Sequence, residues 1–313
     1  MSRIEISVVI ATKNRPAILS CSVEKALEAS RGLPVEIIIV NDGDPLMVDY
    51  QKEAKIKVLK NPSRGVASAR NYGVKQSLGK TIFFIDDDMW INKSGLEWVL
   101  KNLSIVENEK CVFNLNWEYP IELEKQLSNS KIGKYILASN YNTMWGRMHV
   151  PGLQPSFGLY KFVAIASCSL VMNKDLFNHI GAYNEDFIFQ GEDTELSNRL
   201  NKFEVPIFCV FDVLLFHNHA DRLDINGYLD RECRGFSSQF KAELMGLIPE
   251  TSNNYKGYNK LLFHFLKLNE SLLISIIERL PDHRFLTIPS NKLLGILSSL
   301  QRFKEWCKNC KKV

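Results

Sequence analysis

The amino-acid sequence predicts an α/β protein in which helices cover a mostly parallel sheet, followed by a helical C-terminal extension. Short apolar runs recur between Ile4 and Ile85, and helix-length segments separate most of them. Runs that are apolar throughout are typical of strands buried on both faces, and strands joined through helices run parallel. The extension is predicted by charge, since from Lys256 onward the chain carries 11 basic and 4 acidic residues.

Four of the apolar runs are expected to be strands, at 4–11, 35–40, 56–59 and 81–85. Helices are expected at 16–29 and 65–78. The second run ends in Asn41-Asp42-Gly43-Asp44-Pro45, a strong turn signal, and the fourth continues into Asp86-Asp87-Asp88. Because ligands of parallel sheets bind at the carboxyl ends of the strands, both polar turns are expected to line a binding site.

The remaining chain has a less regular pattern. Strands are expected at 111–115, 161–172 and 207–216, and helices at 173–180, 192–203, 227–245, 258–280 and 292–311. In the helix at 192–203, Leu196 and Leu200 share one face, and Glu195 and Arg199 form an i,i+4 pair. We expect one domain over 1–225, with halves at about 1–110 and 111–225, and the extension over 226–313.

Composition excludes several classes of protein. The 313 residues are 45% hydrophobic and 24% charged, which is ordinary for a globular chain and excludes collagen-like, disordered and coiled-coil proteins. A net charge of +4 gives no reason to expect nucleic acid as a partner. The odd number of cysteines, 7, favours a reducing compartment over a disulfide framework.

The sequence also bears on location. Neither a signal-peptide pattern nor a run of about 20 apolar residues is found, so we expect a cytoplasmic protein. Basic helices that also carry Leu, Ile, Phe and Trp can lie on an anionic membrane surface. The extension is therefore expected either to contact the inner face of the plasma membrane peripherally or to be a solvated helical cap.

Three adjacent carboxylates, Asp86, Asp87 and Asp88, follow the fourth apolar run. They repel one another and are costly to bury without a cation. Asp86 and Asp88 leave an extended backbone on the same side, so they can share one Mg²⁺ or Mn²⁺ with the diphosphate of a nucleotide. The alternative is a solvated acidic turn.

Three further features are candidates for chemistry. Glu192-Asp193 opens a helix after an apolar segment, where a carboxylate can act as a general base or simply stabilise the helix N-terminus. His217 and His219 follow a strand, and either can bind the metal or be an ordinary hydrogen-bonded histidine. Trp145 lies in an aromatic-rich segment that either stacks on an acceptor sugar or anchors a loop.

Taken in order, these segments resemble the family 2 glycosyltransferases of the GT-A fold. The resemblance rests on SVVIATKN at 7–14, VEIIIVNDG at 35–43, NPSRGVASARNYG at 61–73, GKTIFFIDDD at 79–88 and the GAYNEDFIFQGEDTELSNRL within 169–200. It covers roughly residues 5–220. The triple aspartate and Gly-Glu-Asp are also similar to a chondroitin-polymerase-like branch, which is a weaker match.

The resemblance implies an inverting transfer from a nucleotide-diphosphate sugar, usually a UDP-sugar, with Mn²⁺ or Mg²⁺ as cofactor. It implies that Asp193 deprotonates the acceptor hydroxyl while Glu192 helps to bind the acceptor. It also implies Asp88 as the main metal ligand, with Asp86 on the ribose or metal side and His217 as a late ligand. The implied nucleotide-binding residues are Thr12, Asn14, Arg15, Asp42 for the uracil, Arg70 for the base or diphosphate, Asp86 and Asp87.

This sequence has Asn41 where many family members have aspartate, but it keeps Asp42. The resemblance implies a role in bacterial surface polysaccharide or glycolipid synthesis, with a glycan or a polyprenyl-linked molecule as acceptor. Two alternatives stay open. One is a nucleotidyltransferase, although the segment ATKNRP lacks the usual glycine-rich loop, and the other is a non-catalytic subunit that binds sugar nucleotides.

Overall fold

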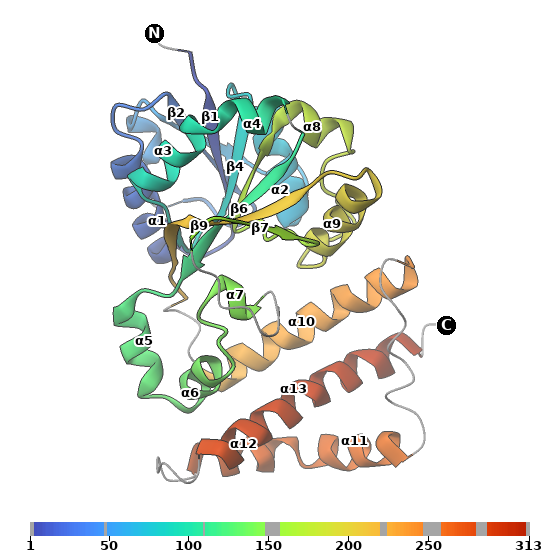
Figure 1. Cartoon of the computed structure of the whole chain (residues 1–313). Coiled ribbons are helices and arrows are strands. Elements are labelled where there is room, and N and C mark those ends of the chain that lie inside the picture. The colour runs from blue at the N-terminus through green and yellow to red at the C-terminus, as the bar shows by residue number, and fades with distance from the viewer. Residues whose placement is uncertain are drawn as a thin grey trace. The chain divides into compact units, whose positions relative to one another are not determined.

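In a computed structural model of the chain, the described residues are 3–46, 49–108, 110–147, 157–219, 224–246, 258–279 and 287–310. The chain divides into two compact units (Figure 1). The first comprises Met1–Tyr119 and Met148–Asn218, and the second comprises Pro120–Arg147 and His219–Val313. Segment 120–147 thus groups with the C-terminal helices, and the domain boundaries predicted from the sequence stay a proposal. Within the described ranges, no helix is both long enough and apolar enough to cross a membrane.

A nine-stranded mixed sheet is the centre of the first unit, in the order β3-β2-β1-β4-β8-β6-β9-β5, with β7 paired to β9. The first four strands are parallel to one another: β1 (Ile6–Thr12), β2 (Val35–Asn41), β3 (Ile56–Lys60) and β4 (Thr81–Asp86). The other five are β5 (Met89–Trp90), β6 (Val112–Glu118), β7 (Leu159–Phe162), β8 (Ser169–Asn173) and β9 (Ile207–His217). β8 is antiparallel to β4 and β6, whereas β6 and β9 are parallel. The predicted α/β class is confirmed.

Strands β1, β2 and β4 are buried on both faces, as their continuous apolar character predicts, whereas β3 is partly exposed. Every residue of β2 is buried. Helix α1 (Pro16–Ala29) begins at a proline, whose fixed φ suits the first helical position. Helix α2 (Val66–Lys75) lies close to β1 and β2 because its inner face carries small residues. A Cβ atom at Gly73 would come within 2.5 Å of Val9 Cγ1.

The first unit has further helices. They are α3 (Lys93–Lys101), α4 (Leu103–Asn108), α8 (Lys174–His179) and α9 (Glu192–Lys202), with a 3₁₀ turn at Tyr50–Lys52. The prediction of a single strand over 161–172 is wrong. This segment contains two strands, β7 and β8, which pair with different neighbours and are separated by a turn at Ser167 and Cys168. This turn becomes important for the site below.

The second unit is helical. Its helices are α5 (Ile121–Ser128), α6 (Lys131–Ala138), α7 (Met144–Arg147), α10 (Ile225–Leu244), α11 (Tyr258–Leu268), α12 (Glu270–Arg279) and α13 (Thr287–Cys310). Helix α13 packs against α6, α10, α11 and α12. Its Leu294, Leu297, Leu300 and Phe303 are completely buried and form the core of this unit. The helix predicted over 258–280 is interrupted at Asn269, which separates α11 from α12.

Candidate active site

The predicted nucleotide-binding residues lie at the carboxyl ends of β1, β2 and β4. Thr12 is the last residue of β1 and pairs with Asn41, the last residue of β2. Ala11 pairs with Asp86, the last residue of β4. Parallel strands in register end at one edge of a sheet, so these side chains come together although up to 74 positions separate Thr12 from Asp86.

Asp42 is held as an acceptor of hydrogen bonds. The Lys13 Nζ atom is 3.0 Å from Asp42 Oδ2, and Asn61 Nδ2 donates to Oδ1 at 2.7 Å. The backbone N–H of Gly65 donates to the same Oδ1 at 3.1 Å. Burial raises the pKa of Asp42, but the hydrogen bonds from Lys13, Asn61 and Gly65 outweigh it, and the net pKa is lowered. Sequence reasoning missed Lys13 and Asn61.

Asn14 and Asn41 shape the two loops beside Asp42. Asn14 has a positive φ of 54°, and its Oδ1 accepts a hydrogen bond from the Asp44 backbone at 2.7 Å. Asn41 Oδ1 accepts one from the Gly43 backbone at 2.9 Å. A Cβ at Gly43 would lie 2.0 Å from Asn14 Oδ1, so only glycine fits this turn. The side chain of Asn14 therefore fastens the loop after β1 to the loop after β2.

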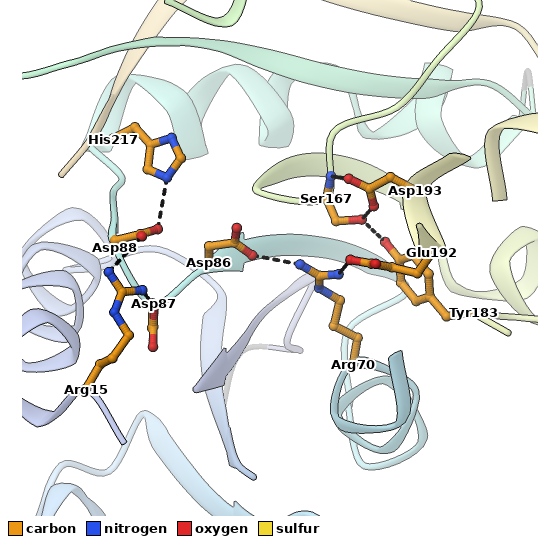
Figure 2. A network of polar contacts seen from close by, with 10 residues as sticks. All are labelled: Arg15, Arg70, Asp86, Asp87, Asp88, Ser167, Tyr183, Glu192, Asp193 and His217. Carbon is orange, nitrogen blue, oxygen red and sulfur yellow. Dashed lines mark hydrogen bonds and ion pairs between the residues drawn. The ribbon is translucent and has the colours of Figure 1, made fainter. Parts of the chain in front are cut away.

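The three adjacent aspartates point to different partners (Figure 2). Arg15 pairs through one nitrogen with Asp87 and through Nη2 with Asp88 at 3.0 Å. Thr12 donates to Asp87 Oδ2 at 2.8 Å. Asp86 is joined to Arg70 instead, at 2.7 Å. Burial, and then the charge of Asp88, raise the pKa of Asp87 to about 7.

A group that can hold a metal ion is centred on Asp88. Its Oδ1 lies 3.0 Å from His217 Nε2, and the ligand atoms of Asp88, His217 and His219 all lie within 4.8 Å of one another. The edge of the His217 ring contacts Trp117 at a centroid distance of 4.7 Å. Mg²⁺ prefers oxygen ligands, whereas imidazole nitrogen suits transition metals, so this mixed donor set fits Mn²⁺ better than Mg²⁺.

Arg70 joins the triple aspartate to the helix α9. Its Nη2 bonds Asp86 and its Nη1 bonds Glu192, each at 2.7 Å (Figure 2). The guanidinium carbon also lies 5.5 Å from the centre of the Tyr183 ring. Burial lowers the pKa of Arg70, but the surrounding carboxylates raise it further than burial lowers it, so the side chain is charged. Arg70 is 3% exposed and pairs with two carboxylates, and its contact with a nucleotide stays a prediction.

Among the described residues, Ser167 is the one that orients the Asp193 carboxylate. The Ser167 backbone N–H donates to Asp193 Oδ2 at 3.0 Å, and the Ser167 hydroxyl donates to Oδ1. With its proton committed to Asp193, the Ser167 hydroxyl oxygen accepts from the hydroxyl of Tyr183. Burial, and then the charge of Glu192, raise the pKa of Asp193 to about 7. A carboxylate with such a pKa can accept a proton at neutral pH.

The chain turns sharply before Asp193. Gln190 and Gly191 both have positive φ angles, 57° and 90°, and α9 starts at the next residue. This turn brings the two carboxylates of Glu192 and Asp193 out of the preceding apolar segment. The predicted Glu195–Arg199 pair is present, with Arg199 Nε donating to Glu195 Oε1 at 2.6 Å. Arg199 also donates to the carbonyls of Ile180 and Ala182, which fastens α9 to the turn before Tyr183.

A second connection links the loop before α2 to the segment before α9. Gly65, the residue before α2, has a φ of 103°, and the next backbone N–H, of Val66, donates to the Ile188 carbonyl at 3.2 Å. A Cβ at Gly65 would come within 2.7 Å of Ile188 Cα. The loop that holds Asp42 is therefore in direct backbone contact with the segment that leads to Asp193.

The structure thus brings most predicted site residues into one connected set in the first unit. Trp145 is different, because it lies on α7 in the second unit, and its contact with an acceptor stays a prediction. Sequence reasoning missed Ser167 and Tyr183. Tyr183 stands in the quoted GAYNEDF segment without a role, and Ser167 was expected inside a strand. The signal for Ser167 would have been a serine at a strand end, opposite a helix that begins with acidic residues.

Solved structures identify the fold of the protein. The structure of GalNAc-T7 with UDP, GalNAc and Mn²⁺ aligns with a TM-score of 0.53 and 13% identity, covering 85% of this chain and 55% of that one. The mannosyltransferase PcManGT from Pyrobaculum calidifontis, in complex with GDP-Man and Mn²⁺, aligns with a TM-score of 0.53 and 11% identity, covering 97% and 88%. The fold is the GT-A fold of glycosyltransferases, as the sequence predicts.

The family is defined by the sequence. Residues 7–165 match the model of Glycosyl transferase family 2, and the chain belongs to this family of sugar-transferring enzymes. An uncharacterized glycosyltransferase of Rickettsia bellii is 30% identical over 149 residues, which are 46% of this chain and 20% of the relative. The O-antigen biosynthesis protein RfbC of Myxococcus xanthus is 20% identical over 227 residues, 69% of this chain and 17% of RfbC. The hyaluronan synthase of Pasteurella multocida is 22% identical over 237 residues, 68% of this chain and 24% of the synthase.

The chain spans less than a quarter of the length of these three relatives. Family and fold agree with the predicted enzyme class.

Proposed function

We propose that the protein is a metal-dependent, inverting glycosyltransferase that moves a sugar from a nucleotide-diphosphate donor, a UDP-sugar by preference, to a hydroxyl of a glycan or lipid-linked acceptor. One observation carries the proposal. A pair that can hold a metal ion, Asp88 and His217, and a carboxylate with a raised pKa, Asp193, lie at one sheet edge, where Arg70 links their neighbours Asp86 and Glu192.

The donor side is supported by the residues after β1, β2 and β4. The pKa of Asp42 is lowered, so its carboxylate is ionised and accepts hydrogen bonds. Such an acceptor suits the N–H group of a uracil. Asp88 and His217, with Asp86 beside them, would hold the Mn²⁺ or Mg²⁺ ion. When bound, such an ion neutralises the charge that builds on a leaving diphosphate. Arg15 pairs with Asp87 and Asp88. With the ion bound to Asp88, Arg15 would be available to bind a phosphate oxygen.

The acceptor side is supported by Asp193. Its carboxylate takes the proton of the acceptor hydroxyl while that oxygen forms a bond to the anomeric carbon and the bond from that carbon to the diphosphate breaks. Ser167 binds both carboxylate oxygens and so fixes their direction, which lowers the entropy cost of reaching the reacting geometry. A single displacement from the face opposite the leaving group inverts the anomeric centre. Glu192, neutralised by Arg70, would bind the acceptor.

The biological setting is proposed from the relatives. One is named an O-antigen biosynthesis protein and another a hyaluronan synthase. Both names concern polysaccharides, which supports a role in surface polysaccharide or glycolipid synthesis at the cytoplasmic face of the membrane.

The test is a screen of UDP-, GDP-, CMP- and dTDP-sugars with Mn²⁺ and with EDTA, which follows nucleotide release by the wild-type protein and by Asp193→Asn. Asp175→Asn is the matched control, because Asp175 is also the second residue of a helix but is exposed. We expect metal-dependent release by the wild type and the control and a large loss in Asp193→Asn. Equal activity of all three proteins, or a product of retained configuration, contradicts the proposal.

Two further assays separate the alternatives. A nucleotidyltransferase would release pyrophosphate from a nucleoside triphosphate and a sugar phosphate. A non-catalytic subunit would bind a sugar nucleotide in calorimetry, turn none of it over, and bind equally well as Asp193→Asn.

A further inference from the structure

The helices α11 and α12 expose a continuous row of large apolar side chains. Six residues of these helices are 40% to 84% exposed: Leu261, Leu262, Phe265, Leu268, Leu272 and Ile276. We call this set the α11–α12 stripe. Positions 261, 265, 268, 272 and 276 follow a spacing of three or four residues, which is one face of a helix. Asn269 interrupts the helix only briefly, since Leu273 N–H bonds the Asn269 carbonyl at 2.9 Å.

The opposite face of the same helices is already used within the second unit. Phe263 stacks on Phe303 of α13 at a centroid distance of 5.2 Å, and Ile277 is completely buried. Glu270 bonds Lys304 of α13 at 2.9 Å. Figure 1 shows α11 and α12 following one another along α13. The helices are therefore apolar on two faces, one of which packs on α13 while the other is exposed. An apolar face of this extent is typical of an interaction site.

Charge identifies the kind of partner. Helix α11 carries Lys260, His264 and Lys267 and has no acidic residue. All three are exposed and lie on one flank of the stripe. The sequence from Lys256 onward has 11 basic and 4 acidic residues, a net charge of +7, whereas the rest of the chain carries −3. A row of apolar residues with lysines beside it is the pattern of a helix that lies in the surface of an anionic bilayer, where the lysines reach the head groups.

We propose that the α11–α12 stripe is a docking surface for an anionic lipid bilayer, with the stripe inserted at the head-group boundary and Lys260 and Lys267 paired to phosphates. This goes beyond the transfer reaction and does not depend on it, because the stripe belongs to the second unit and none of its residues belongs to the candidate active site. It assigns the membrane contact to specific residues. It would also bring the enzyme to the surface where a lipid-linked acceptor is located.

The experiment is co-sedimentation of the full chain with vesicles of phosphatidylglycerol and phosphatidylcholine in equal parts, and with vesicles of phosphatidylcholine alone. We expect binding to the anionic vesicles, weaker binding at high salt, and little binding to the neutral ones. In Leu268→Glu, the partition coefficient is expected to fall at least about tenfold, because a charge would have to enter the acyl boundary.

The control is Leu244→Glu on α10, since Leu244 is 73% exposed and Leu268 is 84% exposed, and the two changes are chemically identical. Leu244→Glu should bind like the wild type. Circular dichroism establishes that both variants are folded, and nucleotide release with a soluble acceptor should be unchanged in both, so a failed transfer reaction and a failed docking surface are distinguishable. The proposal is overturned if the wild type does not sediment with anionic vesicles, or if both variants lose binding equally. It is also overturned if Leu268→Glu keeps its vesicle binding but converts a dimer into a monomer, which would make the stripe a contact between two copies of the chain.

Discussion

Asp88 and Asp193 are both carboxylates at the same sheet edge, yet their surroundings are opposite. Asp88 is 1% exposed and lies between two cationic or metal-binding groups, Arg15 and His217. The direct partner of Asp193 is the neutral Ser167, and the guanidinium of Arg70 is bonded to the neighbouring Glu192 instead. The carboxylate of Asp88 is therefore matched to positive charge, and that of Asp193 is matched to neutral donors.

The difference shows how one fold gives two aspartates different tasks. A carboxylate between a cation and an imidazole suits a metal ligand, whereas a carboxylate whose pKa is raised suits proton transfer. The pKa of Asp193 is raised to about 7, chiefly by burial and then by Glu192. The four predictions that follow test this difference between Asp88 and Asp193 by changing one group at a time.

The largest effect is expected for Asp193→Asn, which keeps the shape of the side chain but cannot accept the proton. We expect kcat to fall by about 10³, within the range for a general base, while the KM for the donor changes little. Steady-state kinetics of Asp193→Asn and the control Asp175→Asn measure this. A loss confined to the donor KM would place Asp193 in donor binding instead.

The next effect concerns the metal-binding pair. Removal of divalent ions with EDTA should abolish transfer, and added Mn²⁺ should restore it more effectively than Mg²⁺. In Asp88→Asn, we expect the Mn²⁺ concentration for half-maximal activity to rise at least about tenfold, since one anionic ligand is lost. His217→Gln should act in the same direction. Full activity of the wild type in EDTA would show that the Asp88–His217 pair has a structural role only.

A smaller effect is expected in the pH profile. The base must be ionised to act, so kcat/KM should fall about tenfold per pH unit below about 7. The hydrogen bond from the Ser167 hydroxyl lowers the pKa of Asp193, so Ser167→Ala should raise that pKa and move the acidic limb to higher pH. Ser169→Ala is the control, because the buried Ser169 hydroxyl has no hydrogen-bond partner among the described residues. An identical profile for wild type and Ser167→Ala would show that another group controls the limb.

The smallest effect is expected for Tyr183→Phe. The ring would still contact Phe84 and Arg70, and only the hydroxyl that donates to Ser167 would be lost. We expect a fall in kcat/KM of about three- to tenfold, in line with the loss of one neutral hydrogen bond. The same acid limb should shift less than in Ser167→Ala. A shift larger than that of Ser167→Ala would mean that Tyr183 acts on Asp193 by a route other than Ser167.

Local patterns in the sequence were sufficient to predict the strands of the first sheet and the residues at their ends. Continuous apolar runs determine β1, β2 and β4, and the register of parallel strands then brings Thr12, Asn41 and Asp86 together. The residues that orient these groups were not predictable in the same way. Ser167 reaches Asp193 across 26 positions, and Arg70 reaches Glu192 across 122, so neither contact leaves a local signal.

Arg70 illustrates the limit. Its place in the ASARN segment predicts a nucleotide contact, which stays a prediction, but gives no sign of the ion pairs with Asp86 and Glu192. The error in the strand over 161–172 also comes from reading a local pattern. Apolar residues continue through the turn at Ser167, and only the pairing of β8 with β4 shows where one strand ends and the next begins.

The contact between Gly65 and Ile188 has a consequence for how such an enzyme can change over evolutionary time. The loop that binds Asp42 and the segment that leads to Asp193 meet backbone to backbone, with no side chain between them to absorb a displacement. An insertion or a larger residue on either side would shift both at once. New donor specificities should therefore arise by exchange of side chains on an unchanged loop path, and Gly65 should be among the last positions to vary when the family acquires a new sugar.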